Sequence, residues 1–254
     1  MVRPGGPGLQ DERERREIGF WGSSETEAPG VESLDVLTNK MSEARVLLEK
    51  LDRFAPLFEA ASVVVDLGAG QCWSSSMLKS RFGADTVVIG TDIAADAVAS
   101  ASRWEDVFKV RLDGRLACRS YATPFADASV DLVVAFAAAH HFGAHRRTLA
   151  EIHRVLRPGG TALYLHEPAC RDLLYRAARW RVNRKRPEVV EDVLRIRHLA
   201  GLATAAGLGC DIRPAPTTTY RGAFETVYYL ALQKLPLLRR VLPCSVDVVL
   251  TKGP

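Results

Sequence analysis

Apolar residues follow two patterns along this chain, short continuous runs and longer segments of helical spacing. The continuous runs predict strands buried on both faces, where alternation with polar residues is not needed, and they cover residues 63–67, 86–92, 130–136 and 161–165. The segments of helical spacing predict amphipathic helices at residues 34–51, 74–82, 94–102 and 146–156. Strands and helices that alternate at this pitch indicate an α/β fold with a parallel sheet and right-handed crossovers.

The pattern is less regular elsewhere. A further strand is expected somewhere in residues 108–120, where no run is well defined. After residue 190 the spacing predicts a helix at 191–206 and two more strands at 211–219 and 245–251. The first 17 residues combine a stretch rich in glycine and proline with a charged one, and we expect them to form a flexible tail. Residues 18–254 are then expected to form one domain.

The first strand ends in Asp66, and two spaced glycines follow it, Gly68 and Gly70. Glycine permits a tight turn with positive φ and lets the backbone come close to a ligand. A dinucleotide-binding turn needs a third glycine three residues later, and Trp73 occupies that position. The turn therefore favours an adenosine ligand without phosphates.

Asp92 ends the second strand about 20 residues beyond the turn, the separation at which a carboxylate accepts hydrogen bonds from ribose hydroxyls. A second interpretation makes Asp92 the N-cap of the helix that follows. The turn and the carboxylate together are stronger evidence of a cofactor than either is alone.

Five motifs in order resemble those of the class I S-adenosylmethionine-dependent methyltransferases, and most closely the ubiquinone/menaquinone-type small-molecule enzymes. They are residues 66–70, Asp92, residues 123–134, residues 140–142 and residues 151–160. The resemblance is strong over residues 60–167. It implies a Rossmann-like, mostly parallel sheet of seven strands in the order 3-2-1-4-5-7-6, with the last strand antiparallel and helices on both faces. It also implies S-adenosylmethionine as the cofactor and S-adenosylhomocysteine as the product.

The resemblance assigns cofactor roles to residues of this chain. The residues that would shape the methionine end, bind the ribose and frame the adenine are Asp66, Gly68, Ala69, Gly70, Asp92, Ile93, Ser120, Tyr121 and Ala137. Arg119 stands where the family usually has an acidic residue at the adenine, and arginine offers no acceptor for an amine. Either Ser120 and Tyr121 take over that contact, or Asp113 reaches in from another register.

Candidate catalytic groups follow the fourth and fifth strands. His140 and His141 are interpreted as a pocket wall or a general base, because imidazole titrates near neutral pH, or as residues that only pack the loop. Glu167 lies at the edge of the sheet where ligands bind, as a base, a partner for a cationic group, or a helix-capping or ion-paired residue. Trp21 either closes over the site or packs against it.

Two insertions after the fifth strand are expected to form the substrate pocket. Residues 169–190 contain seven basic residues and few acidic ones, which is typical either of a lid that attracts an anionic or membrane-associated substrate or of a solvated helix face. Residues 220–244 contain an aromatic cluster followed by leucines. The substrate is expected to be a small molecule or a glycan- or lipid-linked biosynthetic intermediate.

Composition and charge limit the possible substrates, partners and location of the protein. A net charge of +4 tolerates an anionic substrate without requiring nucleic acid, and the chain has no Asn-Pro-Pro-aromatic motif of base-amine methylation. Five cysteines without paired spacing indicate no metal site and no disulfide framework, and we expect a cytoplasmic protein. No apolar run is long enough to span a membrane, so stable insertion is not expected.

Two other functions remain open at this point. A nicotinamide oxidoreductase would share the first two strands, although Trp73 and residues 123–134 oppose it. A catalytically silent protein that binds an adenosine cofactor would share the whole cofactor half. Neither the acceptor atom nor the oligomeric state follows from the sequence.

Overall fold

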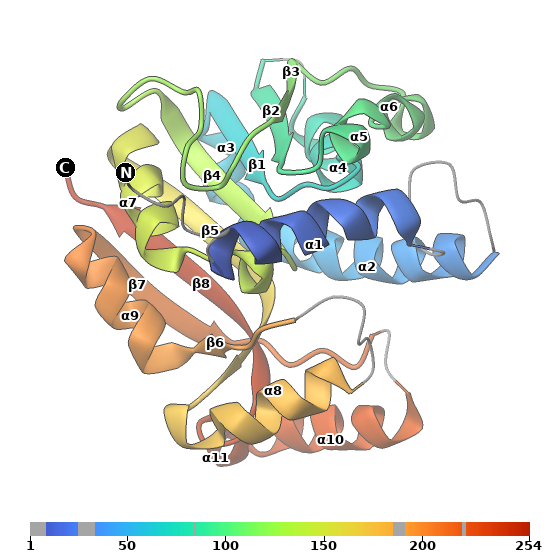
Figure 1. The fold of residues 1–254 in the computed structure, drawn as a ribbon, viewed down its shortest axis with the longest axis vertical. Helices are drawn as coiled ribbons and strands as arrows, with labels where there is room; N and C mark the ends of the chain where they lie inside the picture. The colour runs from blue at the N-terminus through green and yellow to red at the C-terminus, as the bar shows by residue number, and fades with distance from the viewer. Residues whose placement is uncertain (1–8, 25–33, 84, 185–190, 220–221) are drawn as a thin grey trace, which may run out of the picture.

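The computed structural model describes residues 9–24, 34–83, 85–184, 191–219 and 222–254, and its architecture is a twisted central sheet between layers of helices (Figure 1). The sheet has the order β3-β2-β1-β4-β5-β8-β7, and a short strand, β6, pairs with β5 beside this path. The strands are β1 Val63–Leu67, β2 Val87–Asp92, β3 Gly114–Ala117, β4 Val130–Phe136, β5 Leu156–Cys170, β6 Leu194–Arg195, β7 Leu208–Pro214 and β8 Cys244–Lys252. Only β8 runs antiparallel to its neighbours β5 and β7 among the described strands. The predicted order and direction are therefore confirmed, with β8 and β7 as the predicted seventh and sixth strands.

The helices bury apolar side chains on both faces of the sheet. One apolar cluster joins the sheet to α7 His145–Val155 and α9 Ile196–Ala205. The other joins it to α2 Leu34–Arg53, α3 Ala55–Glu59 and α4 Trp73–Phe82. Two short helices, α5 Ala95–Ala99 and α6 Ser102–Phe108, replace the one helix expected at 94–102. The remaining helices are α1 Leu9–Ser23, α8 Tyr175–Asn183, α10 Ala223–Lys234 and α11 Pro236–Arg239, with two 3-10 turns, η1 Ala139–His141 and η2 Asp172–Leu174.

Helix α1 differs from the expected flexible tail. The first eight residues lie outside the described residues, but the chain is helical from Leu9 through Ser23. Figure 1 shows α1 crossing in front of α2 and the edge of the sheet. Polar contacts to other elements hold it there, and such contacts carry no apolar periodicity from which a sequence pattern would predict a helix.

Strand β5 contains one extra residue relative to its partner β8. Tyr164 pairs with Val248 and Glu167 with Val246, so three steps along β5 correspond to two along β8. His166, inside this bulge, has φ of 62°, which is uncommon for a residue with a side chain. Because successive side chains of a strand point to opposite faces, the extra residue sets the side on which Glu167 lies.

A buried ion-pair cluster attaches α2 to the sheet. The Asp247 carboxylate is fully buried and accepts hydrogen bonds from Lys50 Nζ at 2.8 Å and Arg53 at 3.2 Å. The backbone N–H of His166 also donates to it, at 3.2 Å. The cluster thus connects α2, β8 and the bulge in β5.

Replacing Asp247 with alanine is expected to lower the free energy of unfolding by about 3–5 kcal/mol, because it leaves a buried lysine without its counterion. The matched control is Asp211→Ala, which breaks the exposed pair between Asp211 and Arg213 on β7 and is expected to cost less than about 1 kcal/mol. Chemical denaturation measures both. Similar losses in the two variants would contradict the structural role of Asp247.

Within the described ranges, no helix is both long and apolar enough to cross a membrane. None of the five cysteines, all of which lie in the described ranges, forms a disulfide bond, and the described residues contain no cluster of histidine, cysteine and carboxylate side chains suited to a metal ion.

Candidate active site

A cavity of about 960 Å³ opens where the parallel strands end. The glycine turn after β1 and the end of β2 form one end of it, and residues of α8 and α10 form the other. Helix α1 supplies a side wall. The predicted residues among those that line the cavity are Gly68, Ala69, Gly70, Asp92, Ile93, Ser120, Tyr121, Ala137, His140 and His141.

The glycine turn is held in a shape that other residues would not adopt easily. Gly68 has φ of 77° and Gly70 has φ of 53°. A Cβ atom on Gly68 would lie 2.9 Å from the Cβ of Ala138, and one on Gly70 would lie 2.5 Å from the ring of Trp21. Trp21 therefore packs directly over the turn. Gly68 and Gly70 line the cavity beside Trp21.

Gly68→Ala is expected to weaken binding of S-adenosylhomocysteine by at least about tenfold, because the new methyl group combines backbone strain with the contact to Ala138. Gly83→Ala is the matched control, because Gly83 also has a positive φ, 89°, but open space around it. Both variants are expected to lose roughly 1–2 kcal/mol of stability. Isothermal calorimetry should show a binding defect in Gly68→Ala alone, and equal affinities in the two variants would contradict the role of the turn.

Asp66 lies beneath the turn and is not among the described residues that line the cavity. Its Oδ2 accepts hydrogen bonds from Ser74 Oγ at 2.6 Å and Ser75 Oγ at 2.7 Å. Burial raises the pKa of this carboxyl against the effect of the two hydroxyls. Asp66 therefore fixes the start of α4 against the end of β1, and its predicted contact with the cofactor would act through the turn.

Asp92 precedes the N-cap of α5, Ala94, rather than forming it, and its contact with a ribose stays a prediction. Its Oδ1 accepts from the N–H of Ala94 at 2.9 Å, which supports the chain at α5, and its Oδ2 accepts from the N–H of Gly70 at 2.8 Å. Burial raises the pKa of Asp92 to about 6, and the nearby carboxylate of Glu17 adds to the rise. The carboxylate lines the cavity and joins the glycine turn to the end of β2.

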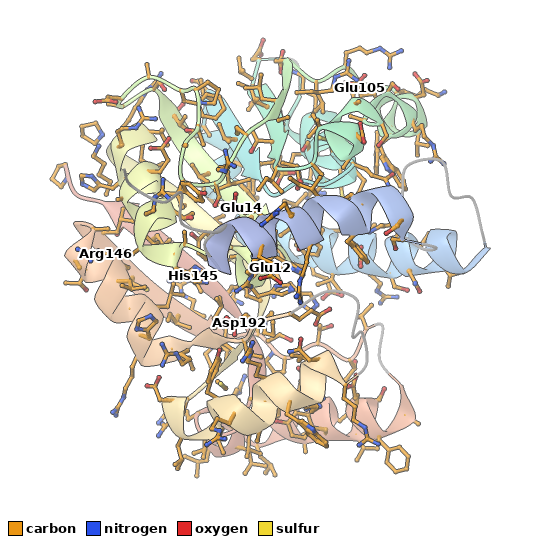
Figure 2. All side chains as sticks on the ribbon, in the orientation of Figure 1. Glu12, Glu14, Glu105, His145, Arg146 and Asp192 are labelled. Carbon is orange, nitrogen blue, oxygen red and sulfur yellow. The ribbon has the colours of Figure 1, made fainter. Side chains whose placement is uncertain are left out.

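Arg119 pairs with a carboxylate from a distant part of the chain. Glu14 of α1 (Figure 2) accepts from Arg119 Nε at 2.8 Å and from the hydroxyl of Tyr121. Glu14 is 8% exposed, so this carboxylate is buried in the wall of the cavity. Ser120 shares a hydrogen bond of 2.9 Å with Thr148 of α7. The carboxylate of Asp113 instead accepts a hydrogen bond from the N–H of Val88 at 2.8 Å, and Asp113 is not among the described residues that line the cavity.

His140 and Glu167 form a buried pair. Glu167 is fully buried and accepts the backbone N–H groups of Ala138, Ala139 and His140 at 2.8–3.1 Å. Its Oε2 lies 2.7 Å from Nδ1 of His140. Burial opposes ionisation, but His140 and the backbone donors outweigh it, so the pKa of Glu167 is lowered. An ionised Glu167 accepts the proton on Nδ1, which leaves Nε2 of His140 as the basic nitrogen.

Glu167 thus orients a cavity residue without lining the cavity itself. Of the roles considered for it, the geometry matches a carboxylate that caps η1 and pairs with a histidine. This arrangement of carboxylate, imidazole and open cavity is the one that general-base sites use.

Helix α1 also holds His141. Nδ1 of His141 lies 3.4 Å from the Glu17 carboxylate, and the imidazole rings of His140 and His141 are 4.1 Å apart. Glu17 outweighs the effect of burial and raises the pKa of His141. Arg13 donates to the carbonyl oxygen of His140 at 3.0 Å and lies 3.7 Å from the carboxylate of Asp192, in the chain before β6. Helix α1 is therefore attached to three separate segments around the cavity.

The far end of the cavity has a mixed wall. Ala178, Val182 and Val193 are apolar lining residues, and Arg181 and Glu225 form an ion pair of 2.9 Å between α8 and α10. Tyr229 and Ser245 share a hydrogen bond of 3.4 Å there. Of the two expected pocket insertions, the described parts of both reach the cavity, while residues 185–190 and 220–221 lie outside the described residues.

The sequence did not indicate the charged residues of α1 as cavity residues, and it placed His166 at the ligand-binding edge of the sheet without a role. The Phe20-Trp21 pair was the one signal in this segment, and it pointed to Trp21 alone. His166 lines the cavity because the bulge in β5 places it there, stacked on Phe136 with ring centres 5.9 Å apart. An extra residue in a strand leaves no mark in the hydrophobic pattern.

Comparison with known proteins locates the family resemblance. Residues 65–164 match the model of a methyltransferase domain, and this range contains the glycine turn, Asp92 and His140. The resemblance inferred from the ordered motifs is thereby confirmed over this range.

Two curated relatives match about the same share of this chain. Malonyl-[acyl-carrier protein] O-methyltransferase 1 of Coxiella burnetii is 35% identical over 121 residues, which is 46% of this chain and 37% of the relative. Demethylmenaquinone methyltransferase of Thermus thermophilus is 33% identical over 115 residues, which is 44% of this chain and 50% of the relative. The matched stretch therefore spans half or less of the length of either protein.

A solved structure supports the fold over more of the chain. Geranyl diphosphate C-methyltransferase of Streptomyces coelicolor A3(2), determined with Mg²⁺, geranyl diphosphate and S-adenosylhomocysteine, has a TM-score of 0.63. The comparison covers 83% of this chain and 80% of that chain at 14% sequence identity. At this identity the likeness concerns the fold, which agrees with the strand order described above.

Proposed function

We propose that this protein transfers a methyl group from S-adenosylmethionine to a small-molecule acceptor. The observation that carries the proposal is that one cavity contains both the glycine turn with Asp92 and the imidazole of His140. The glycine turn and Asp92 would bind the cofactor, and His140, paired with Glu167, would serve as the base. Neither a silent cofactor-binding protein nor a nicotinamide oxidoreductase needs this combination.

The residues of the cavity fit an adenosyl ligand. The turn without side chains at Gly68 and Gly70 would accept the methionine portion, and the ionised form of Asp92 would accept hydrogen bonds from the ribose hydroxyls. Trp73, at the position of a third glycine, is buried and packs edge-on against Phe136. Its bulk opposes a pyrophosphate at the start of α4.

At the adenine, Ile93, Ser120 and Tyr121 would frame the ring, as predicted from the family resemblance. Arg119 stands where the family usually has an acidic residue, and Glu14 supplies a carboxylate next to it. Helix α1 would therefore complete the adenine end of the site and keep water from it.

When bound, S-adenosylmethionine supplies an electrophilic methyl group on its sulfonium. The walls of the cavity would hold an acceptor in line with that methyl group, and such alignment provides much of the acceleration in a displacement reaction. Nε2 of His140 would take the proton that the acceptor releases, while Glu167 stabilises the imidazolium that results. His141 would hold α1 in place through Glu17.

The acceptor is proposed to be an amphiphilic biosynthetic intermediate, such as a lipid- or glycan-linked one. The apolar residues Ala178, Val182 and Val193 would contact its apolar part, and the pair of Arg181 with Glu225 would contact a charged or polar group. The basic balance of α8 favours an acceptor with negative charge. The two relatives, a malonyl-[acyl-carrier protein] O-methyltransferase and a demethylmenaquinone methyltransferase, support the same general class by their names.

Calorimetry with S-adenosylhomocysteine and with NAD tests the cofactor. Binding of the former and none of the latter is expected, and the reverse would overturn the proposal. Incubation with methyl-labelled cofactor and a panel of quinol, carboxylate and lipid-linked acceptors tests transfer. Label in any of these acceptors would exclude a silent cofactor-binding protein.

A further inference from the structure

The outer surface of α8, α10 and α11 combines exposed apolar side chains with arginines. Eight of the thirteen large hydrophobic residues that are exposed in the described chain lie in this part of the molecule, and they are Leu173, Trp180, Phe224, Val227, Leu230, Leu235, Leu237 and Val241. Figure 1 shows the three helices together at the lower end of the molecule, and Figure 2 shows side chains projecting from them away from the sheet. We call this surface the α8–α10–α11 face.

The apolar residues share one side of α10. Phe224, Val227 and Leu230 are exposed, whereas Tyr229 and Leu232 pack into a cluster beneath the helix. Phe224 is 94% exposed and Leu237, on α11, is 74% exposed, so both side chains stand almost free of the protein. Such exposure of large apolar residues side by side marks a surface that contacts a protein or a membrane.

Helix α8 adds positive charge to the same face. Arg176, Arg179 and Arg184 are exposed around Trp180, and none of the three forms an ion pair with a described residue. Over residues 169–184 and 222–243 the chain has eight basic residues and two acidic ones. The two acidic residues are Asp172, 3.8 Å from Arg195, and Glu225, paired with Arg181. The charge of this face therefore favours an anionic partner.

We propose that the α8–α10–α11 face docks on the surface of an anionic lipid bilayer. Phosphate groups of the lipids would accept hydrogen bonds from the arginines, and the hydrocarbon below them would receive Phe224, Leu237 and the ring of Trp180. An acidic protein would satisfy the arginines but would offer charged surface to the apolar side chains. Helices that carry both residue types are typical of interfacial binding.

Two of the three helices of this face, α8 and α10, also form the far end of the cavity, where the acceptor is proposed to bind. Ala178, Arg181 and Val182 line the cavity from α8, and Glu225 and Tyr229 line it from α10. A docked molecule would thus present this end of the cavity to the bilayer. An acceptor held in the membrane would enter the cavity at this end. That consequence rests on the proposed methyl transfer, but the docking itself does not rest on it.

Cosedimentation with vesicles of phosphatidylcholine, alone or mixed with phosphatidylglycerol, tests the proposal. The wild-type protein is expected to bind the mixed vesicles at least about tenfold more tightly. The variant Arg176→Gln/Arg179→Gln is expected to bind the mixed vesicles about fivefold more weakly for each arginine removed. Its control, Lys109→Gln/Arg146→Gln, removes the same charge from exposed positions elsewhere and should bind as the wild type does.

A second pair of variants tests the apolar contact. Trp180→Ser is expected to weaken vesicle binding more than about tenfold. Val107→Ser on α6, where the side chain has the same exposed fraction of 65%, is expected to leave it unchanged. Thermal denaturation and calorimetry with S-adenosylhomocysteine on each variant separate a loss of docking from a loss of folding or of the proposed function.

Three results would overturn the proposal. One is equal binding of the wild type to both kinds of vesicle, and another is equal loss in the charge variant and its control. The third is retention of the wild type by an immobilised acidic carrier protein but not by vesicles, with the same variants defective, which would identify the face as a protein-docking surface.

Discussion

Replacing His140 with alanine is expected to lower kcat for methyl transfer about a hundredfold to ten-thousandfold, the range that a general base contributes. Affinity for S-adenosylhomocysteine is expected to change little, because Nε2 of His140 is assigned to the acceptor. Single-turnover transfer from labelled cofactor, together with calorimetry, measures the two effects separately.

His145→Ala is the matched control for this experiment. His145 begins α7, five residues along the same segment, and it is not among the described residues that line the cavity. Figure 2 shows it between Arg146 and Asp192. The control is expected to retain the wild-type kcat. A His140→Ala variant with full activity would show that alignment of the reactants alone accounts for the rate.

Glu167→Gln is expected to act through His140. The amide keeps the shape of the side chain and one acceptor for the N–H groups of Ala138 and Ala139, but it lacks the negative charge at Nδ1 of His140. We expect kcat to fall at least about tenfold. Thermal denaturation measures the stability of the same variant. A loss of stability with an unchanged kcat would make Glu167 a structural residue only.

Asp92→Ala is expected to weaken the binding of S-adenosylhomocysteine more than about a hundredfold. A hydrogen bond to a charged group contributes about 1.5–3 kcal/mol, and two ribose hydroxyls would donate to this carboxylate. The variant also removes the acceptor for the N–H of Gly70, so the glycine turn loses a support at the same time. Asp92→Asn keeps the shape of the side chain and separates the loss of charge from the loss of the support.

The pH dependence of cofactor binding follows from the same carboxylate. The pKa of Asp92 is raised to about 6 by burial, so the group is ionised above that pH and protonated below it. Affinity is expected to be full above pH ~7 and to fall about tenfold for each pH unit below 6. Glu17 and His141 lie nearby, so Asp92→Asn provides the reference curve. Identical curves for the wild type and this variant would contradict the assignment.

The part of the molecule that contains β1, β2 and β4 could be predicted from the sequence, because its sequence patterns each lie within a short stretch of the chain. Continuous apolar runs define β1 and β4, and the glycines that follow β1 permit one kind of turn. The end of β2 fixes the position of Asp92 by the geometry of parallel strands alone. Strand β4 was predicted at its observed bounds, Val130–Phe136, and the helix expected at 146–156 is shifted by one residue, at His145–Val155.

The features that the sequence did not predict depend on contacts between distant parts of the chain. Glu14 meets Arg119 across 105 residues of sequence, and no pattern near either residue indicates the other. The helix expected at 191–206 begins later, at Ile196, because Leu194 and Arg195 pair with the end of β5 as β6. The strand expected at 211–219 begins earlier, at Leu208, where β8 offers it a partner. Pairing partners, rather than local preference, set these boundaries.

Because of the bulge in β5, the contact between Glu167 and His140 that the proposed chemistry needs depends on the number of residues in that strand. If His166 were deleted, Tyr164 and Glu167 would stand two positions apart instead of three, and the pairing with β8 would then continue without interruption. The strand would gain regularity, but the backbone that now carries the Glu167 carboxylate to His140 would be shorter by one residue. Insertions and deletions at this point are therefore less tolerable than substitutions, since a new side chain leaves the count unchanged.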